Sequence, residues 1–116
     1  SSMQAFLRRG DELLETAWPD ARLVAFGHIG DGNLHYNVVL PDGLTDKEWH
    51  TEGEHVSRAL YDLVHDCGGS FSAEHGVGQS KRAWLELYRG GPELELMRKL
   101  KNSLDPANIL NPGKVI

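Results

Sequence analysis

Four residues with metal-binding or acid–base side chains lie in two glycine-rich segments of this chain. His28 and His35 are separated by six residues in the first segment, and Glu74 and His75 are neighbours in the second. Two imidazoles and one carboxylate form a three-ligand set that leaves a coordination position open for a substrate. A metal held in this way can polarise a substrate oxygen or activate a water molecule. The residue types therefore predict a divalent-metal site formed by His28, His35 and Glu74.

The segment between the two histidines is typical of a tight turn between paired strands. It reads Gly30-Asp31-Gly32-Asn33, and glycine, aspartate and asparagine tolerate the positive φ that such turns require. Apolar and β-branched residues on both sides indicate strands over residues 23–26 and 34–40. We therefore expect an antiparallel hairpin with its turn between the two histidines.

If the hairpin pairs in this way, His28 and His35 lie directly opposite each other and project to one face. Asn37 follows His35 by two residues and so projects to the same face, where it can donate a hydrogen bond to a substrate oxygen. The alternative is that the two histidines only hydrogen-bond the backbone of the loop that they flank.

The second segment follows a short stretch, residues 69–73, which we expect to form a strand. Alternation along a strand would point Glu74 and His75 to opposite faces, so that only one of them joins the site. Glu74 is the better ligand, because a carboxylate with two imidazoles suits zinc, manganese or iron. His75 then remains as a general base or a substrate contact, since imidazole changes protonation near neutral pH. Lys81 could bind a substrate carboxylate. The structural alternatives are a helix-capping Glu74 and a solvated Lys81.

Helices account for most of the remaining chain. Apolar periodicity predicts a helix over residues 3–17, weakened near Gly10. Thr45 and Glu48 have capping-box spacing, which predicts a helix that continues to about Asp66. Two further helices are expected over residues 79–88 and 92–103. The proline-rich tail that follows, residues 105–114, is expected to be extended. This order predicts an α+β fold in which helices cover one face of a small antiparallel sheet.

Composition limits the classes of protein to which the chain can belong. With 40% hydrophobic and 25% charged residues in 116, it fits one globular domain. A net charge of −5 disfavours binding to nucleic acid, so no such partner is expected. No apolar run is long enough to predict a transmembrane segment.

The single cysteine, Cys67, cannot form an intrachain disulfide, which favours a reducing, cytoplasmic location. Residues 1–3 resemble a cloning remnant ahead of a domain that spans residues 4–116.

Three segments of the chain resemble one known family. They are Gly27–His35, Ser72–Gly78 and Asp105–Lys114. They resemble, in the same order, the C-terminal part of the FAD-linked oxidases that carry a vanillyl-alcohol-oxidase-type flavin domain. This group includes D-lactate dehydrogenases, glycolate oxidase FAD subunits and D-2-hydroxyglutarate dehydrogenases. The similarity extends from about Asp20 to the C-terminus.

The resemblance implies roles for particular residues. His28, His35 and Glu74 would hold a divalent metal, zinc in the D-2-hydroxyglutarate dehydrogenase type, which polarises the carboxylate and the 2-hydroxyl group of the substrate. His75 would take the hydroxyl proton as hydride leaves C2 for the flavin. The other expected contacts are Asn37 and Lys81 with the substrate, and Asn111 beside the isoalloxazine ring of FAD.

The resemblance also implies a larger enzyme. The FAD-binding domain would lie upstream of this segment, so we expect neither bound FAD nor turnover of a 2-hydroxy acid from this chain alone. Apolar surface left uncovered would favour self-association, and the intact enzyme could be peripheral to a membrane. Two alternatives from the residues themselves stay open. One is a self-standing hydrolase that uses two histidines and a glutamate, and the other is a non-catalytic metal-binding module.

Overall fold

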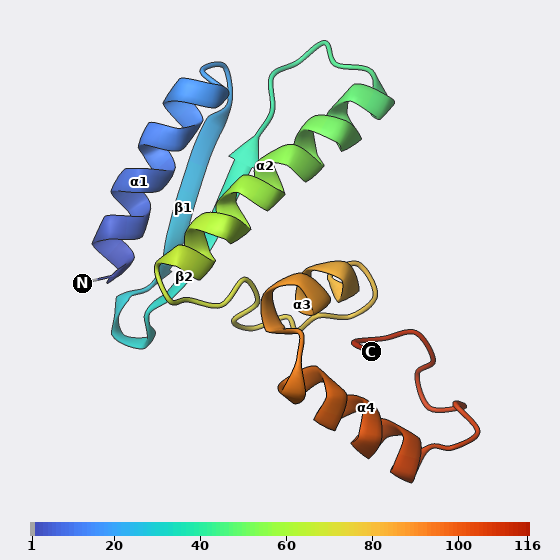
Figure 1. The fold of residues 1–116 in the computed structure, drawn as a ribbon. Helices are drawn as coiled ribbons and strands as arrows, with labels where there is room; N and C mark the ends of the chain where they lie inside the picture. Colours follow the sequence, from blue (N-terminus) through green and yellow to red (C-terminus); the bar gives the residue numbers. More distant parts are fainter. Residues whose placement is uncertain (1) are drawn as a thin grey trace. The chain divides into compact units, whose positions relative to one another are not determined.

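The strands on either side of the glycine-rich turn pair as an antiparallel hairpin. The computed structural model describes residues 2–116, apart from the side chain of Ile29. Within this range β1 (Arg22–His28) pairs with β2 (Asn33–Val39) in a two-stranded sheet (Figure 1). With the helices described below, this sheet confirms the predicted small α+β fold.

The register of the hairpin differs from the one that the sequence suggested. A single turn of 3-10 helix, η1 (Ile29–Asp31), and Gly32 at φ 67° connect the strands. His28 therefore pairs with Asn33, and His35 pairs with Phe26. The prediction that the two histidines lie directly opposite each other is wrong, because the connection ends at Gly32 and Asn33 already belongs to β2. They are diagonal neighbours on the same face, since Asn33 and His35 are two residues apart on one strand.

Two long helices cover the other face of the hairpin. They are α1 (Ser2–Ala17) and α2 (Asp46–Asp66), which lie beside the strands in Figure 1. The predicted capping box at the start of α2 is confirmed. The Glu48 amide donates to Thr45 Oγ1 at 3.3 Å, and the Thr45 amide donates to Glu48 Oε2 at 2.8 Å. The second of these bonds, which stabilises the carboxylate, lowers the pKa of Glu48.

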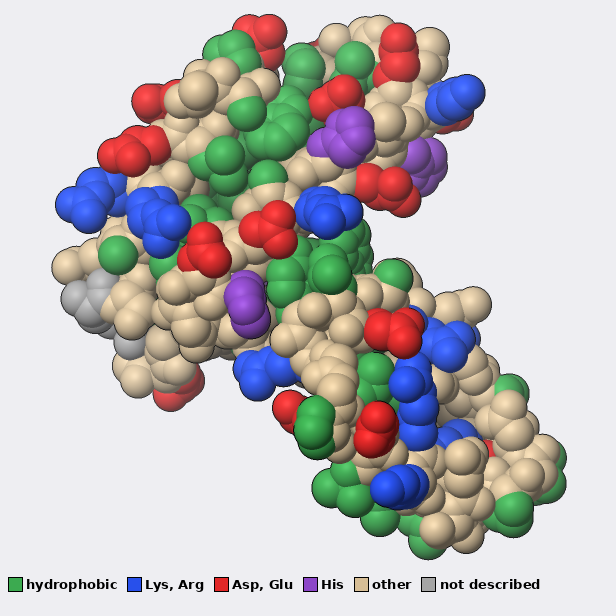
Figure 2. All heavy atoms as spheres, viewed as in Figure 1, with side chains coloured by type: hydrophobic (Ala, Val, Ile, Leu, Met, Phe, Trp, Pro, Cys, Tyr) green, Lys and Arg blue, Asp and Glu red, His purple; other side chains and the backbone are tan. Residues whose placement is uncertain are grey.

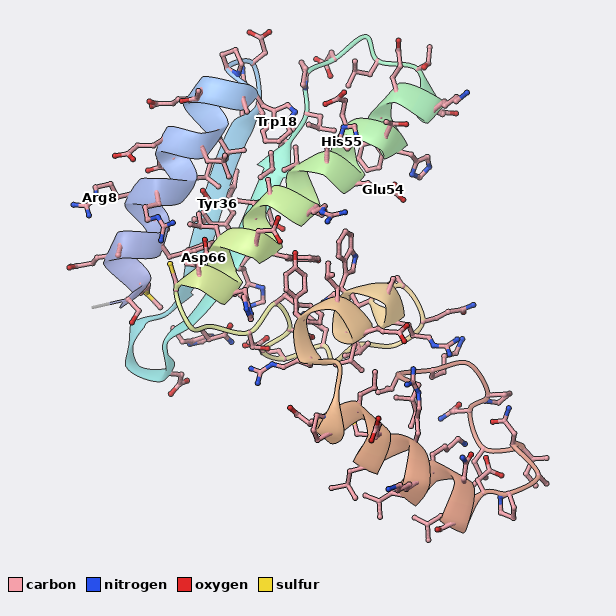
Figure 3. All side chains as sticks on the ribbon, viewed as in Figure 1. Arg8, Trp18, Tyr36, Glu54, His55 and Asp66 are labelled. Atoms are coloured by element: carbon pink, nitrogen blue, oxygen red, sulfur yellow. The ribbon has the colours of Figure 1, made fainter. Side chains whose placement is uncertain are left out.

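The core of this part of the chain lies between the helices and the hairpin. Its buried centre consists of Leu14, Val56 and Leu60. Partly buried side chains from the strands and helices pack around them: Leu13, Trp18, Leu23, Tyr36, Val38 and Leu40. The Trp18 indole N–H donates to Glu52 Oε2 at 3.0 Å and so satisfies its polar atom at the edge of the core, between α1 and α2 (Figure 3).

The chain divides into two compact units, Ser1–Phe71 and Ser72–Ile116. The second unit contains α3 (Arg82–Arg89) and α4 (Pro92–Leu104), which bury Leu85 and Leu94. The α4 helix matches its prediction closely. The α3 helix begins three residues later than expected, because the preceding loop keeps a left-handed backbone at Gly78, φ 57°.

Two predicted extended segments are not extended in the structure. Residues 69–73 form no strand. The first of them, Gly69, caps the C-terminal end of α2, because its amide donates to the Val64 carbonyl at 2.9 Å. Glycine and serine dominate this stretch and give it little strand propensity. The tail after α4 is a series of turns, with Asn108 and Asn111 in left-handed conformations at φ 52° and 47°. Asparagine tolerates this conformation better than most residues.

Among the helices that the structure describes, none combines the length and the apolar character needed to cross a lipid bilayer.

Candidate functional site

The face of the hairpin that the helices leave open carries the predicted site residues of the first unit. Strand alternation and the register place His28, His35 and Asn37 on this face. Around them lie apolar side chains that are about half exposed: Val24 at 50%, Phe26 at 57% and Val39 at 52%. The predicted grouping of two imidazoles and one amide on one face therefore holds in the structure. His28 and His35 are diagonal neighbours across the strands, and their joint role as metal ligands remains a prediction.

His35 has an aromatic neighbour that the sequence did not reveal. The ring of Phe26, directly across the strands, stacks on the imidazole with centroids 4.9 Å apart and planes inclined by 9°. Only the register could have shown this pairing, because Phe26 and His35 are nine residues apart in the chain and the predicted register paired His35 with His28.

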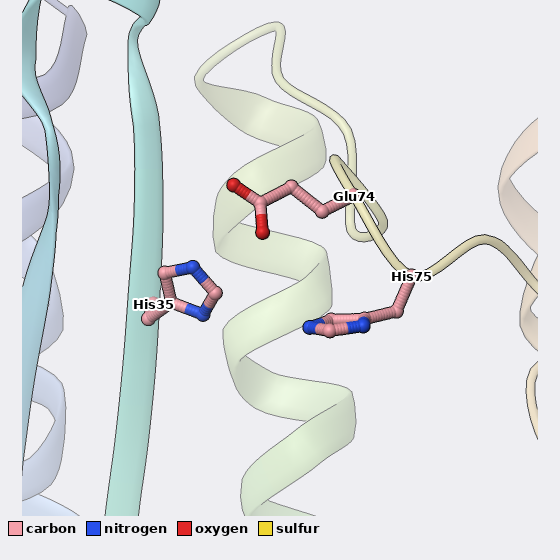
Figure 4. A group of neighbouring side chains, drawn as sticks. All are labelled: His35, Glu74 and His75. Atoms are coloured by element: carbon pink, nitrogen blue, oxygen red, sulfur yellow. The ribbon is translucent and has the colours of Figure 1, made fainter.

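Glu74 and His75 lie in a closed loop of the second unit and not beside a strand. The Ser72 hydroxyl donates to the Gly76 carbonyl at 2.6 Å and spans the two residues, while Gly76 turns the chain at φ 69°. Strand alternation therefore does not separate their side chains, and the prediction that only one of them can serve a given site is wrong. Figure 4 draws Glu74 and His75 as successive residues of this loop, together with His35 from β2.

Lys81 belongs to the framework of the same loop. It occupies the N-cap position of α3, and its ammonium group donates to Ser72 Oγ at 3.5 Å. The C-terminal end of the chain is hydrogen-bonded to the residues that follow this loop. The Lys114 ammonium donates to Gln79 Oε1 at 2.8 Å. The Val115 amide donates to the Gly78 carbonyl at 2.7 Å. The role of Lys81 as a substrate contact remains a prediction.

A buried carboxylate organises the tail in which Asn111 lies. Asp105 is 5% exposed and accepts from the amides of Ile109 and Leu110, each at 3.0 Å. The Lys101 ammonium binds both this carboxylate and the Leu110 carbonyl. The hydrogen bond from Lys101 is the main reason why the pKa of Asp105 is lowered, and the two amides lower it further. Asn111 follows this clamp and is exposed; its contact with a flavin remains a prediction.

The clamp was missed at the sequence level, although Lys101 and Asp105 have the spacing of a helical ion pair. The Asp-Pro step after a predicted helix was the available signal, because aspartate at such a position often accepts hydrogen bonds from the following amides.

The chemistry of the donor groups fits a divalent ion of the first transition row. His35, Glu74 and His75 each offer one ligand atom, an imidazole nitrogen or a carboxylate oxygen, whereas His28 is not a member of this group of donors. Nitrogen and carboxylate donors without thiolates suit zinc, manganese or iron(II). These donor types are compatible with a metal of this kind, and the metal site itself remains a prediction.

Comparison with known proteins identifies the family. The family model "FAD linked oxidases, C-terminal domain" matches residues 1–115. A D-2-hydroxyglutarate dehydrogenase of Stutzerimonas stutzeri is 43% identical over 96% of this chain and 24% of its own length. A protein of the same name from Xanthomonas citri pv. viticola is 44% identical over 99% of this chain and 24% of its own length. A D-lactate dehydrogenase of Archaeoglobus fulgidus is 40% identical over 96% of this chain and 23% of its own length.

These relatives are much longer than the chain, which spans about a quarter of their length. The match covers both units, the two glycine-rich segments and the tail. The chain therefore belongs to the family of C-terminal domains of FAD-linked oxidases.

Proposed function

We propose that this chain is the substrate- and metal-binding segment of a flavin-dependent dehydrogenase that oxidises a D-2-hydroxy acid to the 2-oxo acid. The observation that carries the proposal is the family match over residues 1–115, together with the names of the relatives. D-2-hydroxyglutarate and D-lactate share a carboxylate and a hydroxyl-bearing C2 of the same configuration. A site for this shared unit needs a group that polarises its oxygens and a base for its hydroxyl proton.

The proposal gives each site residue one task. His28, His35 and Glu74 hold a divalent metal, which we take to be zinc, and Asn37 and Lys81 contact substrate oxygens. His75 takes the hydroxyl proton at an imidazole nitrogen as the C2–H bond breaks and the C2–OH group becomes a carbonyl. When bound, FAD supplies the hydride acceptor, and the metal supplies the charge that polarises the substrate carboxylate and hydroxyl.

FAD itself would be held mainly by a further domain of the same polypeptide. The chain spans about a quarter of its relatives, and the matched family is named as the C-terminal domain of enzymes linked to FAD. In this proposal Asn111 lies close to the flavin ring. The dehydrogenase names of the relatives favour oxidation over the hydrolase and over the non-catalytic metal-binding module.

The test is the turnover of the full-length polypeptide with D-2-hydroxyglutarate, D-lactate and glycolate, each with and without a chelator. Removing a residue that hydrogen-bonds to a metal ligand lowers activity about 10- to 100-fold. Loss of a ligand itself should therefore lower activity at least about tenfold. Glu74→Gln should therefore lower kcat by more than about tenfold at normal flavin content.

The matched control for this test is Glu95→Gln, which makes the same change on the exposed surface of α4 and should leave kcat unchanged. Full activity of the Glu74→Gln enzyme would contradict the ligand role of Glu74. Absence of turnover with every 2-hydroxy acid in the panel would contradict the proposed reaction.

A further inference from the structure

The contact between Phe26 and His35 places an aromatic ring flat against a proposed metal ligand. The two residues are register partners across the hairpin, with ring centroids 4.9 Å apart and planes inclined by 9°. Phe26 is 57% exposed, which is costly for so large an apolar side chain. Burial in the core therefore does not account for its position on the open face.

The geometry of the stack suggests what that reason is. An imidazole binds a metal through a nitrogen lone pair, which lies in the plane of the ring and points outward from its edge. A parallel stack covers one flat side of the imidazole and makes no contact through the ring edge. The contact with Phe26 can thus fix the plane of the His35 ring without using either nitrogen.

Fixing this plane matters because the terminal torsion of a histidine side chain is broad and only weakly restricted by its own backbone. A ligand ring that is already oriented loses less conformational freedom when the metal binds, which improves affinity. Cross-strand aromatic pairs are strong enough to supply such a restraint.

We propose that Phe26 is a positioning residue that orients the His35 imidazole for binding of a divalent metal. The inference rests on the proposed function, in which His35 is a metal ligand, and adds to it a residue that makes no contact with the ion through a donor atom.

The test measures the affinity of the 116-residue chain for zinc, by competition with a chromophoric chelator. Phe26→Leu removes the stack but keeps an apolar side chain on the strand. Its affinity should fall about two- to tenfold, which corresponds to the range measured for single aromatic pairs. Phe26→Tyr retains the ring and should keep the affinity of the wild type. Val24→Ala changes the same face of the same strand two residues away and should also keep it.

Two outcomes would overturn the positioning role: a Phe26→Leu chain that binds zinc as tightly as the wild type, or a Phe26→Tyr chain that binds it as weakly as Phe26→Leu. In a His35→Ala background, Phe26→Leu should have no additional effect on residual zinc binding. An additional loss there would mean that Phe26 acts on the strand and not on His35.

Failure of the metal site itself gives a different pattern. If the wild-type chain binds no zinc, or His35→Ala binds it normally, the ligand assignment is wrong, and the positioning role is overturned with it. The stack can be followed independently of metal through the NMR shifts of the His35 ring protons. They should lie in the shielding region of the Phe26 ring and move toward ordinary values in Phe26→Leu. Retained shielding without zinc binding would locate the failure in the proposed function.

Discussion

Tyr36 buries a hydroxyl group for which no hydrogen-bond partner is found among the described residues. Its ring extends from β2 toward α1, where it makes an edge contact with Phe6 at a centroid distance of 5.2 Å (Figure 3). Burial disfavours the charged phenolate and, with a smaller contribution from the negative charge of Asp11, raises the pKa of Tyr36 to about 12. This polar atom therefore weakens the core both at neutral pH, through its missing partner, and at alkaline pH, through its titration.

Replacement of Tyr36 by phenylalanine should separate the two effects. A tyrosine in the unfolded chain titrates near pH 10. The folded state of the wild type holds the Tyr36 proton to about pH 12, so the ionisation of Tyr36 does not affect stability below about pH 10 and favours unfolding as the pH rises from there toward 12. Tyr36→Phe should remove this part of the alkaline loss. At pH 7 it should be as stable as the wild type or more stable, because an unsatisfied buried hydroxyl is lost.

Urea unfolding at a series of pH values between 7 and 11 would measure both effects. Some alkaline loss should remain in the variant, because burial also raises the pKa of Tyr61. An alkaline loss in Tyr36→Phe equal to that of the wild type, or a large destabilisation at pH 7, would contradict this account of the buried hydroxyl.

Among the secondary-structure elements, α1 shows how a glycine that weakens a helix locally can be required by packing. Gly10 lies in the middle of α1 and is buried, and the helix continues through it. A Cβ atom added there would lie 2.4 Å from the Tyr36 hydroxyl oxygen and 3.1 Å from the ring carbon that bears it. The absence of a side chain is what allows the strand residue to approach the helix so closely.

Gly10→Ala should therefore destabilise the chain, although the same change in an exposed helix stabilises by about 1 kcal/mol. Overpacking of this kind costs about 1–3 kcal/mol, because the Tyr36 ring is stiff and already rests against Phe6. The double variant Gly10→Ala/Tyr36→Phe removes the nearest atom and should recover most of the loss. Thermal unfolding of the two single variants and the double variant would measure the coupling. Equal effects of Gly10→Ala in the two backgrounds would show that the hydroxyl is not the obstacle.

The sequence predicted the elements better than the way in which they pair. The capping box at Thr45 located the start of α2, and Pro92 located the start of α4, because both signals act within one helical turn. The register of the hairpin depends on the conformation of η1, which glycine and aspartate allow but do not determine. For the same reason the grouping of His28 with His35 was predictable, whereas the stacking of Phe26 on His35 was not.

At the scale of the whole chain, each unit has a small core. No large side chain of the described residues is fully buried. In Ser72–Ile116, α4 turns Leu94 inward but leaves a row of leucines at every fourth position exposed: Leu96 at 57%, Leu100 at 55% and Leu104 at 80%. Hydrophobic side chains accordingly gather along α4 on the surface that Figure 2 shows. Exposed apolar rows of this length are unusual on isolated soluble domains and are typical of interaction surfaces.

We expect the 116-residue chain on its own to self-associate through this row of leucines. Light scattering after size-exclusion chromatography should give a mass above the 12.9 kDa of one chain, and the mass should rise with concentration. Leu100→Glu places a charge at the centre of the row, where burial against a second copy would be costly, and should shift the chain toward the monomer. Asn102→Glu introduces the same charge at an exposed polar position of α4 and should leave the association unchanged. A monomeric wild type at every concentration, or equal effects of the two substitutions, would contradict association through the leucine row.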